Sequence, residues 1–252
     1  MISVPRLTRL ALAGALSLAP SLAHAQLNTM TAQYFKVQNN SAVNPDFQHG
    51  IDGGIVTGLV QNTLGPNGLP VVSTYGATRS GGSGPITQTS GTGELLWWTP
   101  NGSSILSDGT APVGVPFSGM ATNFFPSGQS SNSNWFRTAI FTGMVNVTNP
   151  TAYSFSLGSD DDSWLFIDGM LAGDNGGVKA NNPTTFSTGM LGSGSHTVQI
   201  FFADRNTVQS GITFDPQFRV STVPEPSSLS LLATGLVGVV GAVRRRSKKL
   251  LA

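Results

Sequence analysis

The sequence predicts an all-β fold, an antiparallel β-sandwich, and three observations favour it. Gly, Ser, Thr and Asn dominate the chain between its two ends. No stretch there keeps the 3.6-residue apolar period of an amphipathic helix. Short runs alternate between apolar and polar residues instead, with turn residues at short intervals, which is typical of antiparallel sandwiches and barrels.

The expected strands are clearest in the second half of the chain. Tyr153–Leu157 places Tyr, Phe and Leu on one face, and Thr197–Phe202 does the same with Val, Ile and Phe. Trp164–Ile167 is apolar on both faces, which predicts a central strand buried on both sides. Asp168-Gly169 directly after it predicts a tight turn.

The N-terminus has the layout of a secretory signal peptide. Arg6 and Arg9 precede the apolar or small run Leu10–Leu22, which ends at the small-x-small site Ala23-His24-Ala25. The run is too short for a transmembrane anchor, which needs about 20 residues. We therefore expect residues 1–25 to be removed and the mature chain to begin near Gln26.

The C-terminus combines three features in order. Val223-Pro224-Glu225-Pro226 is followed by the uncharged stretch Ser227–Val243 and then by five cations within Arg244–Lys249. Seventeen uncharged residues are at the short edge of what can cross a bilayer. The cations would stay on the cytoplasmic side, which leaves the preceding chain outside.

This order resembles the PEP-CTERM sorting signal over residues 223–249. The resemblance implies that an exosortase cuts near Pro224-Glu225-Pro226 and that the tail holds the protein in the inner membrane only transiently. The released protein is then expected at the cell surface or in the extracellular matrix.

The body of the chain, residues 26–222, is expected to form a single β-sandwich domain. It has no cysteine, so disulfides and thiolate metal sites are excluded. It carries six Lys or Arg against eleven Asp or Glu, a net charge of about −5. An acidic body argues against binding nucleic acid through phosphates and is compatible with divalent cations.

One series of residues resembles the protective-antigen-type (PA-fourteen) β-sandwich and its bacterial relative, the fibro-slime domain. The family pattern of Tyr-x-Phe, Ser-Asp-Asp, an apolar strand and Ile-Asp-Gly matches Tyr153–Gly169. The resemblance is good over about 125–220 and weaker before it. It implies a sandwich of the kind found in sugar-binding adhesins, glycosidase accessory modules and toxin assembly domains.

The resemblance also implies a calcium site at Asp160 and Asp161, joined by a cis peptide bond in the adhesin branch, and Asp162 adds a third charge. Calcium takes 6–8 oxygen ligands, so a further loop would contribute, with Asp204, Asn206 and the Asp174-Asn175 turn as candidates. The alternative stays open, because Asp-rich turns before strands often serve turn structure alone.

Trp97 and Trp98 are the candidate carbohydrate-binding residues. As two adjacent strand residues, they should point to opposite faces, so that one faces outward, where an indole can stack on a sugar. The alternative is that they belong to the core, as Trp residues are mostly buried.

Catalysis is not expected. The sequence has no Gly-x-Ser-x-Gly, no His-Glu-x-x-His and no phosphate-binding loop, and only His49 and His196 follow the signal peptide. Two hypotheses remain. The first is a calcium-supported module that binds exopolysaccharide or glycans in adhesion, and the second is a structural matrix or scaffold protein without a sugar or metal ligand.

Overall fold

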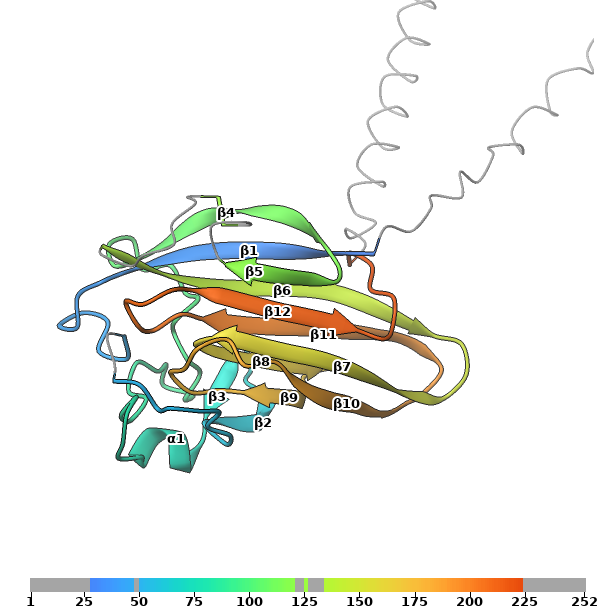
Figure 1. Cartoon of the computed structure of the whole chain (residues 1–252), viewed down its shortest axis with the longest axis horizontal. Coiled ribbons are helices and arrows are strands. Elements are labelled where there is room, and N and C mark those ends of the chain that lie inside the picture. Colours follow the sequence, from blue (N-terminus) through green and yellow to red (C-terminus); the bar gives the residue numbers. More distant parts are fainter. Residues whose placement is uncertain (1–27, 48–49, 121–124, 127–133, 224–252) are drawn as a thin grey trace, which may run out of the picture.

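The computed structural model describes residues 28–47, 50–120, 125–126 and 134–223, and its regular structure is almost entirely strand (Figure 1). The strands are β1 (Thr29–Gln38), β2 (Val60–Leu64), β3 (Pro70–Val72), β4 (Ile105–Gly114), β5 (Phe117–Met120), β6 (Trp135–Val147), β7 (Thr151–Asp160), β8 (Asp162–Ile167), β9 (Met170–Asn175), β10 (Thr184–Leu191), β11 (Gly194–Ala203) and β12 (Gly211–Pro216). A single short helix, α1 (Thr74–Thr78), occurs in this part of the chain.

The strands form two antiparallel sheets. The larger sheet has the order β3-β2-β9-β8-β11-β6-β1-β4, and the smaller one has the order β10-β7-β12-β5. All pairings within them are antiparallel, so the predicted antiparallel β-sandwich is confirmed. The turn at Asp168-Gly169 is also confirmed, because both residues have positive φ (49° and 77°), as a two-residue hairpin turn requires.

A first hydrophobic core lies between the two sheets. Phe155 and Leu157 of β7 enter it from the smaller sheet, and Val198, Ile200 and Phe202 of β11 enter it from the larger one. These are the residues that the alternating pattern predicts on one face of each strand. Burial of such alternate side chains provides the main stabilisation of a sandwich.

A second core lies on the opposite face of the larger sheet. In β8, Leu165 and Ile167 face the first core while Trp164 and Phe166 face the second, so the prediction of a strand buried on both sides is confirmed. Segments 39–47, 50–59 and 73–104 cover this outer face and contribute the apolar side chains that come from outside the strands, which are Phe47, Leu59, Ile86, Leu95, Trp97 and Trp98. The irregular segments in the first half of the chain therefore bury the outer face of the larger sheet.

The two ends of the described chain lie side by side. The Thr29 N–H donates to the Val220 carbonyl at 3.2 Å, and Met144 of β6 pairs with Ser221. Thr138, six residues earlier in β6, is in register with Ala203 at the far end of β11. At about 3.3 Å per residue, the Ala203 end of β11 lies about 20 Å along the sheet from Met144, where the two ends of the described chain meet.

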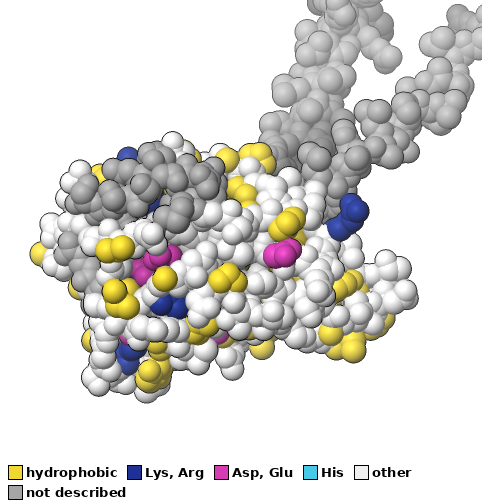
Figure 2. All heavy atoms as spheres, in the orientation of Figure 1, with side chains coloured by type: hydrophobic (Ala, Val, Ile, Leu, Met, Phe, Trp, Pro, Cys, Tyr) yellow, Lys and Arg dark blue, Asp and Glu magenta, His cyan; other side chains and the backbone are white. Residues whose placement is uncertain are grey.

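Several expectations fall outside the described residues. These are the signal peptide (1–25), the Pro224-Glu225-Pro226 triplet and the segment 227–243. Among the residues that the structure does describe, no helix is long and apolar enough to cross a membrane. The surface visible in Figure 2 consists mainly of neutral polar side chains and backbone, with charged side chains in small groups.

Candidate functional site

The chain crosses from the smaller sheet to the larger one at an acidic corner. Asp160 is the last residue of β7, Asp162 is the first residue of β8, and Asp161 joins them. All three side chains are buried, and the Asp160–Asp161 peptide bond is cis. The run of three aspartates is therefore not an exposed turn but part of the protein interior.

Asp162 forms a closed ion pair. Its Oδ2 accepts a hydrogen bond from Arg205 Nε at 2.6 Å, and its Oδ1 accepts one from the Gly177 N–H at 2.6 Å. Both side chains are fully buried, and the Arg205 guanidinium lies 4.8 Å from the centre of the Trp97 ring. The structure separates Asp162 from the other two aspartates, because it is ion-paired with Arg205 in the interior and is not among the residues that line the pocket in front of Asp160 and Asp161.

Asp161 is held from two sides. Its Oδ1 accepts a hydrogen bond from the Lys179 N–H at 3.0 Å, and its Oδ2 accepts one from the Arg205 N–H at 2.6 Å. Its main-chain carbonyl accepts bonds from Ser159 Oγ at 2.7 Å and from Lys179 Nζ at 2.6 Å. The orientation of the Asp161 carboxylate is thus determined by backbone groups of two different loops.

Lys179 places a buried positive charge behind the corner. Its ammonium donates to the carbonyl oxygens of Ser159 (3.0 Å), Asp161 (2.6 Å) and Asn175 (3.2 Å). Burial lowers the pKa of Lys179 to about 8, although the neighbouring aspartates oppose the shift. The loop that carries Lys179 packs closely on β7. At Gly158 in β7 there is no room for a side chain, since a Cβ there would lie 2.5 Å from Cα of Pro183 in this loop.

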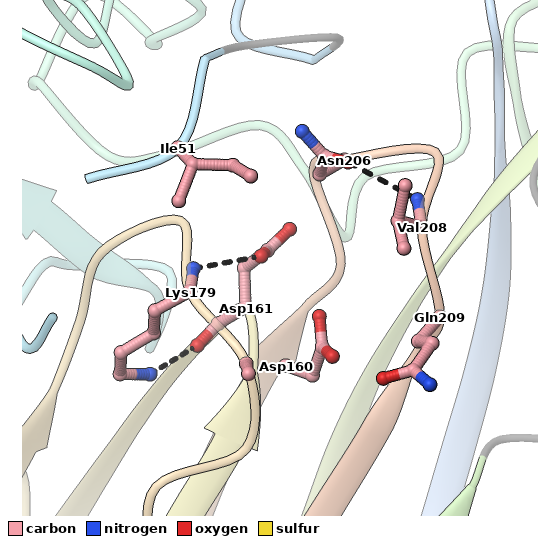
Figure 3. Close-up of a pocket in the computed structure, with 8 residues that line it drawn as sticks. Ile51, Asp160, Asp161, Lys179, Asn206, Val208 and Gln209 are labelled. Atoms are coloured by element: carbon pink, nitrogen blue, oxygen red, sulfur yellow. Dashed lines mark hydrogen bonds between the residues drawn. The ribbon is translucent and has the colours of Figure 1, made fainter. Parts of the chain in front are cut away.

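A pocket of about 110 Å³ opens in front of Asp160 and Asp161 (Figure 3). In Figure 3 the Asp160 side chain extends toward the loop that carries Val208 and Gln209. The described residues that line it are Ile51, Asp160, Asp161, Lys179, Ala180, Asn206, Val208 and Gln209. A water molecule needs only about 10–15 Å³ of such volume, so the pocket has room for an ion and several further oxygen ligands.

The two pocket carboxylates resist ionisation. Burial raises the pKa of Asp160 from its ordinary value of 3.8 to about 6. Burial, together with the negative charges of Asp162 and Asp160, raises the pKa of Asp161 to about 7. When ionised, the three aspartates exceed the two cations, Lys179 and Arg205, by one negative charge. A further cation would relieve this excess.

The donor set suits a hard cation such as calcium, with a limited number of protein ligands. Asp160 and Asp161 offer carboxylate oxygens, and Asn206 lines the pocket from the opposite loop, where its Oδ1 accepts the Val208 N–H. Within the described ranges, no three carboxylate or imidazole side chains converge on one point. The protein would therefore supply fewer than the 6–8 oxygens that calcium takes, and water or a ligand would supply the others.

Of the additional ligands considered from the sequence, Asn206 lines the pocket, whereas Asp174 and Asn175 do not. Asp174 accepts hydrogen bonds from the Gly58 N–H and from Trp164 Nε1, on the side of the second core. Asn175 donates to the Asn182 carbonyl. Asp204 is buried and does not line the pocket.

The expectation that Trp97 or Trp98 is exposed is wrong. The two residues lie in a turn and not in a strand, so alternation does not apply to them, and they are only 0% and 3% exposed. Trp97 Nε1 donates to Asp46 at 2.9 Å, and Trp98 Nε1 donates to the Phe202 carbonyl at 3.0 Å. Both indoles belong to the second core and offer no face to a sugar.

Sequence reasoning missed several residues that line the pocket, namely Ile51, Lys179, Ala180, Val208 and Gln209. Lys179 carried a weak signal, since it is one of only six cations in the body of the chain. The aliphatic residues carried none, because they lie in loops that no motif connects with the aspartates.

The fold is an antiparallel β-sandwich with an Asp-Asp pair in a loop-lined pocket. The family model of the PA14 domain matches residues 127–227 of this chain. The chain also carries a PEP-CTERM protein-sorting motif, matched over residues 222–246. The resemblances to the PA-fourteen sandwich and to the PEP-CTERM signal are thereby confirmed, and the sorting motif indicates export through the membrane to the cell surface or extracellular space.

Solved structures similar to this chain include three of low identity. An α-xylosidase from Xanthomonas citri is 19% identical over 51% of this chain and 13% of its own length, with a TM-score of 0.35. A PA14 sugar-binding domain from an RTX adhesin is 14% identical over 77% and 90%, with a TM-score of 0.32. An epithelial adhesin domain from Candida glabrata, solved with Galβ1-3GlcNAc, is 10% identical over 77% and 86%, with a TM-score of 0.34. This chain thus spans only a small part of the xylosidase, and the search of curated proteins gave no match.

Proposed function

We propose that this protein is an exported, non-catalytic surface or matrix protein that binds carbohydrate through a calcium site at Asp160 and Asp161. One observation carries the proposal. Two adjacent buried carboxylates, whose pKa values are raised to about 6 and about 7, form the floor of a pocket that is open to solvent. Raised pKa values of this kind often mark functional sites.

Calcium would supply open coordination positions that the hydroxyl oxygens of a saccharide can fill. The chain itself orients the donors. The N–H groups of Lys179 and Arg205 hold the Asp161 carboxylate, and Asn206 faces it from the β11–β12 loop. The buried Lys179 ammonium binds three carbonyl oxygens behind the corner and so keeps the donors in place without a metal.

The arrangement suits binding better than glycoside hydrolysis. A glycosidase needs two carboxyl groups about 5–10 Å apart on opposite sides of the scissile bond. Asp160 and Asp161 are adjacent, and the other side chains that line the pocket in the described ranges include no carboxylate. Glu94 is hydrogen-bonded to Asn67 and Thr92, away from this pocket.

The position of the pocket fits a surface protein. It lies next to the Ala203 end of β11, about 20 Å along the sheet from the place where the two ends of the described chain meet. We propose that the signal peptide is removed before Gln26 and that an exosortase processes the chain near Pro224-Glu225-Pro226.

Affinity chromatography on the host's own exopolysaccharide tests this proposal. The exported protein should be retained with millimolar calcium and released by a chelator. Asp161→Asn should abolish retention, whereas Asp215→Asn, which changes an exposed carboxylate in β12, should leave it intact. A protein that passes through this column and stays unbound on a broad glycan array would instead be a scaffold whose sandwich only packs against other proteins.

A further inference from the structure

Two aliphatic side chains stand at the mouth of the pocket beside the carboxylates. Ile51 comes from the loop between β1 and β2, and Val208 comes from the loop between β11 and β12 (Figure 3). They are 67% and 65% exposed. Among the described residues, the exposed large hydrophobic side chains are Val43, Ile51, Tyr75, Met170, Met190, Val208 and Val223, so two of the seven border this one small pocket.

The backbone holds Ile51 in this exposed position. The next residue, Asp52, forms two hydrogen bonds with Val178. Its N–H donates to the Val178 carbonyl, and its Oδ2 accepts from the Val178 N–H. Asp52 Oδ1 also accepts from Arg79 at 2.8 Å and from the Ser83 N–H at 3.0 Å. Ile51 is therefore attached to a fixed segment and not to a free loop tip.

Val208 is held in a comparable way on the other side. Its N–H donates to Asn206 Oδ1 at 3.1 Å, which closes a local turn and directs the valine to the mouth of the pocket. The pocket thus combines two buried carboxylates and two amides with two exposed aliphatic groups at its mouth. Among the described residues, no aromatic side chain lines the pocket.

We infer that the pocket selects a saccharide unit that carries an apolar substituent, such as the methyl group of a 6-deoxyhexose. The inference rests on the proposed function and adds the class of ligand to it. Hydroxyl groups of the sugar would face the carboxylate side, and the methyl group would pack between Ile51 and Val208. A hydroxymethyl group in the same place would lose water contacts against aliphatic side chains without gaining a comparable partner.

Pairs of sugars that differ only at this group provide the test. L-fucose is compared with L-galactose, and L-rhamnose with L-mannose, by titration calorimetry of the exported protein in millimolar calcium. At least one 6-deoxy sugar should bind roughly three- to tenfold more tightly than its parent. One apolar group in a closed hydrophobic pocket typically gives about tenfold discrimination or more. We expect a smaller ratio here because this pocket is open to solvent.

Variants of the two aliphatic residues show whether they cause the preference. Ile51→Ser and Val208→Ser should each bring the ratio of the two dissociation constants toward one, while the calcium-induced rise in melting temperature stays unchanged. Val43→Ser is the matched control, because Val43 is an exposed aliphatic residue outside this pocket, and it should keep the preference.

The possible results distinguish a wrong sugar preference from a wrong proposal of carbohydrate binding. Equal binding of 6-deoxy and parent sugars, or a preference that survives in both serine variants, overturns the inference and leaves the proposed function standing. Absence of binding to all four sugars and to the host's exopolysaccharide overturns the proposed function, and the inference falls with it.

Discussion

Lys179 holds Asp161 with both of its nitrogen atoms. Its main-chain N–H donates to the Asp161 carboxylate at 3.0 Å, and its ammonium donates to the Asp161 carbonyl oxygen at 2.6 Å. One residue thereby fixes both the carboxylate and the main-chain carbonyl of Asp161. The corner is built to keep its geometry when no external cation is present.

Lys179→Met should destabilise the protein by about 2–4 kcal/mol, because it leaves three buried carbonyl groups without their charged donor. Chemical unfolding in chelator measures the loss. Lys36→Met is the control, since Lys36 is partly exposed and its pair with Asp108 spans 4.0 Å, and it should cost no more than about 1 kcal/mol. Equal unfolding midpoints for the two variants would contradict the role given to Lys179.

Calcium should raise the melting temperature of the protein, because the ion would bind the folded state and not the unfolded chain. At free calcium 100-fold above its dissociation constant, the added stability is about 2.7 kcal/mol. Each kcal/mol corresponds to about 2–4 °C for a domain of this size, so the rise should be several degrees. Asp161→Asn should flatten the response and Asp215→Asn should keep it. A wild-type melting temperature that is the same in calcium and in chelator would rule out the calcium site.

The calcium-free protein should lose stability as pH rises from about 4 to about 7. The pKa values of Asp160 and Asp161 are raised in the folded state from 3.8 to about 6 and about 7, so the folded state holds protons that the unfolded chain has released in this window. Stability falls with pH wherever the folded state binds more protons. The raised pKa values of Asp174 and His196 act in the same direction, so the comparison must be made against Asp160→Asn/Asp161→Asn, whose profile should be flatter.

Protons and calcium should also compete at this corner. As pH falls below about 7, the two carboxylates become protonated, and calcium affinity should weaken by at least about tenfold between pH 8 and pH 5.5. Calcium titrations at several pH values measure this dependence. An affinity that does not change over this range would place the ion elsewhere.

Trp97→Phe should cost stability and leave saccharide binding intact. The change removes the hydrogen bond to Asp46 and leaves a void in the second core, for an expected loss of about 2–4 kcal/mol. Tyr75→Ser, at an exposed aromatic residue, should change stability by no more than about 0.5 kcal/mol. If the folded Trp97→Phe variant no longer binds polysaccharide, the indole has a role in recognition after all.

The C-terminal tail should be absent from the mature protein. The sorting motif covers residues 222–246, and processing near Pro224-Glu225-Pro226 would remove the apolar stretch and the basic cluster together. Intact-mass analysis of protein from the host's surface should show a chain that ends within or next to that triplet. A surface protein that still carries Arg244–Lys249 would show that the segment is a permanent anchor.

Local patterns in the sequence were sufficient for the fold class and the sorting motif. Val198, Ile200 and Phe202 enter one core because side chains alternate along a strand, whatever the strand pairs with. The sorting motif depends only on the order of three short segments. The Asp160-Asp161 pair belongs to the same category, because it is contiguous and precedes a recognisable apolar strand.

Only the tertiary structure decided what surrounds that pair. Ile51, Lys179 and Val208 come from three loops that the register of the sheets brings together, and no local pattern connects them. The structure also separated Asp162 from the pocket, because its carboxylate pairs with the buried Arg205. It buried Trp97 and Trp98, because both indoles pack in the second core. Strand periodicity is a property of neighbours along the chain, whereas a pocket made of loops depends on which distant segments meet and on which partner each polar side chain finds there.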